Sequence, residues 1–375
     1  MPTEFDKWWA DPKKHYKRMN YWLPPAKTLK SELGSSRVFR YFTLCSRSMI
    51  DVFMLAREGV LNYDPIRGTV IHVRFCESDS EQFPEIGELI GIENAGFFGE
   101  LEELVLFQDN PYTAQYQTLE SINEALEDEG LAIDKRQKLQ TKRTHLYVEA
   151  SFPYDFINLD FCGYYYPKPP DILKINRTVE KFLDWQRQYE NGGISAGPGV
   201  GVQDFLLSVT CRHDDDFPRA AEKRLSELVK SNCELHSDYK KYLEEKRCVS
   251  DLNTWMQSER EDFFLSTWPK EISRLAQQYQ WGMKILGYVH YDRVSDEGRP
   301  YKIICLICRF TRISKDPNYI QVAIDALDQS KRRLISEIVK TTQNGQTLLG
   351  DLTEIVNLRN GQAKRRSRPL LPIAW

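Results

Sequence analysis

The chain has 375 residues, of which 41% are hydrophobic and 28% are charged, and its formal net charge at pH 7 is −3. This composition is typical of a globular protein and excludes a strongly basic chain that coats nucleic acid, so any basic footprint must be local. No apolar run approaches the roughly 18–20 residues of a membrane-spanning helix, so we expect no membrane partner.

The first part of the chain, residues 1–35, combines aromatic and basic side chains. Trp8, Trp9 and Trp22 stand among lysines, and two prolines, Pro24 and Pro25, follow. The stretch lacks the apolar core of a signal peptide. We predict an N-terminal arm that packs its aromatic side chains on the body of the protein or on a partner.

From residue 37 onward, strand-like apolar runs alternate with runs that show helical spacing. The segment 99–109 (GELEELVLFQD) fits either a helix or a strand. The predicted strands are 37–43, 69–77, 145–150, 156–161 and 205–211. The predicted helices cover about 46–59, 118–138, 177–189 and 217–281.

A hairpin is predicted next, with strands KILGYVHY (284–291) and YKIICLICRF (301–310) on either side of a polar loop. Alternating strands and helices indicate an α/β fold with a mainly parallel, Rossmann-like sheet, to which the hairpin adds an antiparallel edge. We therefore expect an α/β domain at 36–312, with a helical insertion at about 217–281. A helical extension with a basic tail, 313–375, follows it.

Eight cysteines are scattered along the chain, most of them inside apolar runs. Strand alternation points Cys305 and Cys308 to opposite faces, which argues against a zinc or redox role for this CxxC pair. His213 and the aspartates 214–216 are interpreted as an acidic helix cap rather than a metal site. We expect no metal and a reducing, cytoplasmic location.

The segment Tyr154–Tyr166 (YDFINLDFCGYYY) is the strongest indication of a site. Asn158 and Asp160 share one face of a predicted strand, and ligands of open α/β sheets lie just outside the carboxyl ends of strands. Their oxygens could position an amine by hydrogen bonds, and Tyr164 and Tyr165 could stack on a flipped base. The alternative is a strand-end Asp that binds loop amides, beside tyrosines that only pack.

From about Arg37 to Phe310, this order of parts resembles the class I S-adenosylmethionine-dependent methyltransferase fold. The segment YDFINLDFCG resembles the family's fourth motif, Asp/Asn-Pro-Pro-Tyr in amino-methylating members. It also resembles the Asp-Pro-x-Gly variant of bacterial proteins that partner three-cysteine-motif proteins. The resemblance implies a catalytic Asp160 and Asn158 and a substrate-binding Tyr164 and Tyr165. It also implies cofactor contacts from Thr43, Ser46, Glu77 and Asp109.

The function implied by the resemblance is S-adenosylmethionine-dependent methylation of an amino group, with nucleic acid as the substrate. Two departures keep an alternative open, because the stretch Thr43–Ser48 has no glycine where the family has a glycine-rich turn, and the fourth motif has no proline pair. The alternative is a catalytically inactive methyltransferase-fold scaffold in a multi-protein complex, such as one of antiviral defence. Its protein partner would contact the N-terminal arm and the C-terminal helices.

Overall fold

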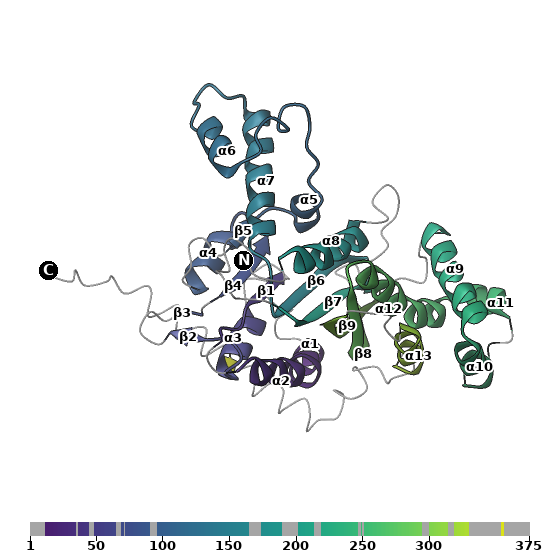
Figure 1. Ribbon diagram of the computed structural model, residues 1–375. Helices are drawn as coiled ribbons and strands as arrows, with labels where there is room; N and C mark the ends of the chain where they lie inside the picture. Colours follow the sequence, from purple (N-terminus) through teal and green to yellow (C-terminus); the bar gives the residue numbers. More distant parts are fainter. Residues whose placement is uncertain are drawn as a thin grey trace.

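A seven-stranded sheet carries the fold in the computed structural model (Figure 1). The structure describes residues 12–34, 37–44, 49–64, 69–70, 72–90, 96–164, 174–189, 202–213, 219–246, 249, 251–294, 300–313, 319–329 and 354–355. The strands of the sheet are β1 (Tyr41–Leu44), β4 (Val73–Glu77), β5 (Gly96–Phe98), β6 (Phe156–Tyr164), β7 (Asp204–His213), β8 (Trp281–Val294) and β9 (Pro300–Arg312).

The strands lie side by side in the order β5-β4-β1-β6-β7-β9-β8. Neighbouring strands from β5 to β7 are parallel, whereas β9 runs antiparallel to both β7 and β8. Renumbered in chain order within this sheet, the strands follow the order 3-2-1-4-5-7-6. The predicted α/β class, the mainly parallel sheet and the terminal hairpin are confirmed. A separate pair, β2 (Tyr63–Asp64) and β3 (Thr69–Val70), is antiparallel.

Alternating side chains of the strands bury two hydrophobic layers, one on each face of the sheet. Leu206 and Ile307 belong to one layer, and their neighbours Leu207 and Leu306 belong to the other. The first layer packs against α1 (Pro12–Lys17), the π-helix η2 (Arg18–Trp22), α2 (Leu23–Leu33), α3 (Ile50–Arg57) and α4 (Gln82–Ile90).

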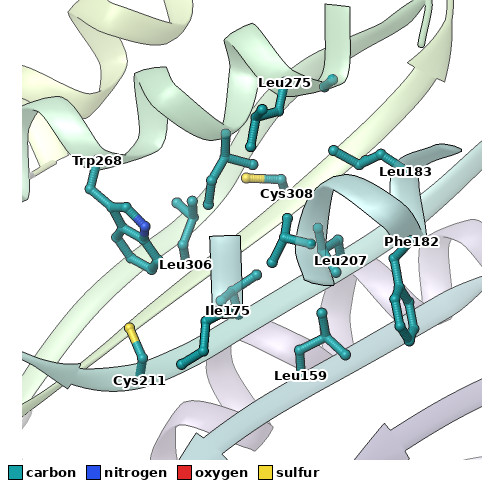
Figure 2. Close-up of a cluster of buried hydrophobic side chains, with 14 of the residues drawn as sticks. Leu159, Ile175, Phe182, Leu183, Leu207, Cys211, Trp268, Leu275, Leu306 and Cys308 are labelled. Carbon is teal, nitrogen blue, oxygen red and sulfur yellow. The ribbon is translucent and has the colours of Figure 1, made fainter. Parts of the chain in front are cut away.

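The second layer holds the larger group of helices, and Figure 2 shows how Phe182 and Trp268 meet Leu159, Leu207 and Leu306 of the strands. The helices that contribute buried side chains are α5 (Leu101–Val105), α7 (Ile133–Ala150), α8 (Lys174–Gln188), α9 (Arg219–Leu235), α10 (Ser237–Lys246), α11 (Leu252–Ser258), α12 (Arg260–Gln278) and α13 (Tyr319–Gln329). Together with α6 (Leu119–Leu126), helix α7 projects away from the sheet (Figure 1).

The N-terminal arm is part of the core. Trp22 is fully buried, and its ring meets Phe156 of β6 edge-on, with the ring centroids 5.9 Å apart. Leu23, Ala26 and Leu29 of α2 are buried beside it. Packing of the arm on the body is therefore confirmed for Trp22, while Trp8 and Trp9 lie outside the described residues.

A buried carboxylate ties the amino ends of β1 and β6 together. Asp155, which is fully buried, accepts a hydrogen bond from the Arg40 amide at 2.8 Å and pairs with the Arg37 guanidinium at 2.7 Å. In return, the Asp155 amide donates to the Arg40 carbonyl at 2.9 Å. These contacts align the two central strands before they reach their carboxyl ends.

Two element predictions need correction, and one that was left open is decided. The strand predicted at 145–150 is wrong, because these residues are the last turns of α7; six residues are too few for apolar content to separate a strand from a helix. The strand predicted at 69–77 is divided between β3 and β4, with His72 between them at a φ of 63°. The ambiguous segment 99–109 contains the short helix α5 and then a loop.

The predicted placement of Cys305 and Cys308 on opposite faces is confirmed, since Cys305 lies in the first hydrophobic layer and Cys308 in the second. Both thiols are free and buried. Within the described residues, no group of three or more His, Cys, Asp or Glu side chains could hold a metal ion. In the same part of the chain, no helix combines the length and the apolar character needed to cross a membrane.

Replacing Trp22 with alanine tests whether the arm belongs to the core. We expect Trp22→Ala to lower the free energy of unfolding by about 3–5 kcal/mol, because it leaves a large cavity against Phe156. Urea denaturation followed by circular dichroism measures the change. The control is Ile133→Ala, at a side chain that is 77% exposed, for which we expect a change within about 0.5 kcal/mol. Equal effects of the two substitutions would show that the arm packs only loosely.

Candidate functional site

The candidate site lies at the carboxyl ends of β1, β4 and β6. The chain moves from β1 to β4 and β5 on one side of the sheet, and from β6 to β7 on the other, so the order reverses between β1 and β6. Ligands of open α/β sheets bind at such a point of reversal. The register places Thr43 of β1 directly beside Asn158 of β6.

Next to this edge, the carboxylate of Asp51 contacts three side chains. Its Oδ2 atom accepts hydrogen bonds from the Tyr41 hydroxyl at 2.7 Å and the Thr43 hydroxyl at 2.8 Å. The amide of Asn158 donates to Thr43 Oγ1 at 3.1 Å and lies 3.5 Å from the same carboxylate oxygen. Thr43 and Asn158 are almost fully buried, so these contacts favour a supporting role for both side chains.

Asp51 was not singled out from the sequence, although it lies in the first turn of α3, where the helix dipole favours a negative charge. Burial, followed by the charge of Asp51, raises the pKa of Tyr41 well above its ordinary value. The Tyr41 hydroxyl therefore stays protonated and remains a donor. One signal in the sequence could have indicated this hydrogen-bond network around Asp51. It is an acidic residue in the first turn of the helix that follows a central strand.

Asp160 is the predicted residue that reaches the edge. It follows Asn158 by two positions on the same face of β6, its side chain is 14% exposed, and its Oδ2 lies 2.6 Å from the ammonium of Lys14 in α1. Lys17, one turn further along the arm, is fully buried, donates to the Thr210 hydroxyl at 3.1 Å and lies 4.5 Å from the centroid of the Trp22 ring. The arm thus covers the carboxyl end of β6 with basic side chains.

The charge of Asp160 is maintained by these cations. Burial alone raises the pKa of a carboxyl, but Lys14 and Lys17, with a smaller effect of Arg18, outweigh it and bring the pKa of Asp160 to about 2. Burial in turn lowers the pKa of Lys17. Asp160 is therefore ionised at neutral pH and is a weak base.

Directly after Asp160, β6 carries a bulge. Asp160 pairs with Thr210 and Tyr164 pairs with Arg212, so β6 advances four residues where β7 advances two. Bulges next to ligand sites redirect the side chains that follow them. The bulge was not predicted, and Gly163 within the strand run is the signal that indicates one.

Glu77 lies at the carboxyl end of β4, two strands away from Asp160. Its Oε1 atom accepts a hydrogen bond from the Asp79 amide at 2.9 Å, and Asp79 in turn accepts from the amides of Glu81 and Gln82 where α4 begins. Burial raises the pKa of Glu77, an effect that the amides of Asp79 and Ser78 oppose. Glu77 is therefore a half-buried acceptor at the end of the second strand in chain order.

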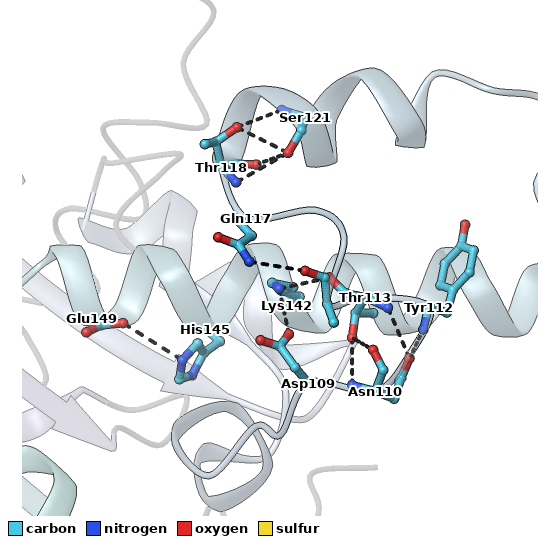
Figure 3. A network of polar contacts seen from close by, with 11 residues as sticks. Asp109, Asn110, Tyr112, Thr113, Gln117, Thr118, Ser121, Lys142, His145 and Glu149 are labelled. Atoms are coloured by element: carbon cyan, nitrogen blue, oxygen red, sulfur yellow. Dashed lines mark hydrogen bonds and ion pairs between the residues drawn. The ribbon is translucent and has the colours of Figure 1, made fainter.

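Asp109 belongs to a different part of the molecule. It follows α5 in a loop, its side chain is 53% exposed, and it pairs with Lys142 of α7 at 2.5 Å. Lys142 also donates to the Thr113 carbonyl at 2.9 Å, so it holds the loop against the helix (Figure 3). Asp109 is therefore not at the end of a strand. Its ion-pair partner belongs to α7, and none of its described contacts is with the residues at the carboxyl edge of the sheet.

Two predicted residues, Ser46 and Tyr165, lie outside the described residues. Tyr164 is the last residue of β6, and only its backbone position is described. The aspartates 214–216 and the basic tail also lie outside. The described residues therefore bring together Thr43, Asn158 and Asp160, with Glu77 on the same edge.

Comparison of the chain with protein-family models, curated proteins and solved structures finds no match. The function of the site therefore has to be inferred from its own geometry and from the topology of the sheet.

Replacing Asp51 with alanine tests the buried network. The change leaves the Tyr41 and Thr43 hydroxyls buried without their acceptor, and we expect Asp51→Ala to cost about 3 kcal/mol of unfolding free energy. Urea denaturation measures it. The matched control is Asp134→Ala, which removes an exposed first-turn aspartate from α7. A loss no greater than that of the control would contradict the network.

The pH dependence of stability tests the environment of Asp160. Its pKa is lowered from 3.8 to about 2, so its stabilising effect of about 2 kcal/mol is complete above pH 4 and is lost as the pH falls toward 2. We expect the stability difference between the wild type and Asp160→Asn to shrink over this range. Denaturant titrations at a series of pH values measure it. A difference that does not change between pH 5 and pH 2.5 would exclude the ion-paired state.

Proposed function

We propose that the protein is a class I methyltransferase-like enzyme that methylates an amino group of a nucleic acid. The observation that carries the proposal is the strand order 3-2-1-4-5-7-6 with an antiparallel seventh strand, which is the order of the class I methyltransferase sheet. Glu77 is the last residue of the second strand of this order, and Asp160 lies in the fourth strand, directly before its bulge. These are the positions of the family's ribose-binding acid and fourth motif.

The described residues fit part of the cofactor site. Glu77 is a half-buried carboxylate that could accept hydrogen bonds from a ribose diol at the end of β4. Thr43, in contrast, is fully buried, and its hydroxyl already donates to Asp51. When bound, S-adenosylmethionine supplies an electrophilic methyl group on its sulfonium.

Asp160 would position the acceptor amine. Its Oδ2 atom binds Lys14, while its Oδ1 atom forms no hydrogen bond with the described residues and can accept one from an amine. A carboxyl with a pKa of about 2 is a poor general base at neutral pH. Asp160 therefore acts by orienting the lone pair of a neutral amine toward the methyl group.

The other side chains at this edge support Asp160. Asn158 and Asp51 hold β1 and β6 at a fixed spacing below it, and Lys14 keeps its carboxylate in place. Rigid support of this kind is what an alignment-based reaction requires, because small misplacements of the reacting atoms reduce the rate strongly.

Isothermal titration calorimetry with S-adenosylmethionine and with its demethylated product tests the proposal. We expect both to bind, and Glu77→Gln to weaken binding about tenfold or more, because a hydrogen bond to a charged acceptor is lost. Glu81→Gln, at a nearby exposed carboxylate, is the matched control and should bind as the wild type does. No heat of binding at millimolar cofactor would contradict the proposal.

A second candidate function is a catalytically inactive scaffold with the same fold. The observation that favours it is the Lys14–Asp160 ion pair, since the residue proposed to receive the substrate already has a partner in its own chain. A folded protein that binds no cofactor in the calorimetry experiment would support this candidate. The buried arm residues mean that this possibility is better tested by point substitutions than by deletion of the arm.

A further inference from the structure

We propose that Lys14, Lys17 and Arg18 form a phosphate-binding site beside Asp160, and that its ligand is the phosphodiester backbone of the nucleic acid that carries the acceptor amine. The inference rests on the proposed function, because it names a second part of the same substrate. It assigns the N-terminal arm a role in substrate binding besides its role in the core.

The spacing of the three cations places them together. Positions 14, 17 and 18 are three and four residues apart, so they share one face where the helix runs from α1 into η2. Like charges on one helix face repel one another. Among the described residues, Asp160 is the carboxylate that lies against this face, where it pairs with Lys14. Its negative charge offsets one of the three positive charges. Within the part of the chain that the structure describes, these three cations and one carboxylate leave the cluster positive.

The buried donors of Arg18 support a ligand at this site independently of the charge of the cluster. Its side chain is only 4% exposed, yet its Nε and Nη1 atoms have no hydrogen-bond partner among the atoms of the described residues. A buried charged donor without an acceptor is costly, so most buried arginines are paired. The unused donors belong to a planar guanidinium, whose geometry matches two oxygens of a phosphate.

The neighbours of Arg18 limit what the ligand can be. Lys17 is held by the Thr210 hydroxyl and the Trp22 ring, and Lys14 is shared with Asp160. The cluster is compact, and the whole chain carries a net charge of −3, so it suits one or two phosphates rather than an extended anionic surface. A base amine on Asp160 Oδ1 and a phosphate on Arg18 would then belong to one bound nucleotide segment.

Access to the site requires movement. Because Arg18 is almost completely covered, an anion can reach it only in the fraction of molecules in which the cover has opened, and the apparent affinity falls by that fraction. Inorganic phosphate alone should therefore bind weakly. A single-stranded oligonucleotide, which adds base contacts, should bind more tightly than a nucleoside monophosphate.

Fluorescence anisotropy with the full chain and no cofactor tests the proposal. The probe is a labelled single-stranded 12-mer, compared with the same sequence on an uncharged methylphosphonate backbone. We expect the wild type to bind the phosphodiester probe at least tenfold more tightly. We expect Arg18→Gln to remove most of that difference, whereas Arg143→Gln, the same substitution on α7, should not. Nucleoside monophosphate and inorganic phosphate compete in separate arms and distinguish a polynucleotide from a free phosphate.

Thermal unfolding separates this role from a structural one. Arg18→Gln removes a buried group with two unsatisfied donors, so its unfolding temperature without ligand should equal or exceed that of the wild type. A lower unfolding temperature together with unchanged oligonucleotide binding would overturn the proposal, as would equal wild-type affinity for the two backbones. Lys14→Gln, at a more accessible side chain, gives a second variant that should also weaken phosphodiester binding.

The outcome is independent of the calorimetry with S-adenosylmethionine. Loss of cofactor binding with intact phosphodiester selectivity would reject methylation and keep the phosphate site. Cofactor binding without backbone selectivity would reject the phosphate site and keep methylation.

Discussion

The carboxylate of Asp51 is the interaction on which the central part of the structure depends. It accepts hydrogen bonds from Tyr41 and Thr43 of β1 and approaches the amide of Asn158 of β6, so it joins two strands to the first turn of α3. Asp155 joins the amino ends of the same two strands through Arg37 and Arg40. Between these buried aspartates, β1 and β6 keep a fixed register. These contacts fix β1 and β6 relative to each other at the point where the strand order reverses.

The N-terminal arm connects this rigid centre to the candidate site. Trp22 is buried against Phe156, and this contact brings Lys14, Lys17 and Arg18 over the carboxyl end of β6. Asp160 is kept ionised there, with a pKa of about 2, although burial opposes its charge. The same arm thus contributes apolar packing, the partner of Asp160 and the unused donors of Arg18. A change in the arm would affect stability and the electrostatics of the site together.

Those parts of the fold that depend on the local periodicity of apolar residues were predictable from the sequence. The hairpin 284–310, the helices around 177–189 and 217–281, and the opposite faces of Cys305 and Cys308 followed from periodicity. The run HLYVEA was misassigned to a strand because six residues carry too little periodicity to separate a strand from the end of a long helix. At the site, Asp160 was predicted at a strand end, whereas β6 continues beyond it to Tyr164. The burial of Asn158 and Thr43 was not predicted. A strand-end position alone does not show which residues face a neighbouring helix.

The sequence by itself determined the class of architecture, because strand and helix periods are local and a hairpin joins neighbours in the chain. It also indicated an acid on each of two strands, Glu77 at the end of β4 and Asp160 within β6. Only the tertiary structure decided the partners of these acids. Asp160 meets Lys14, which is 146 positions away, and Asn158 meets Thr43 and Asp51, more than a hundred positions away. Contacts at such separations depend on the order of strands in the sheet and on the path of the arm, which local patterns do not encode.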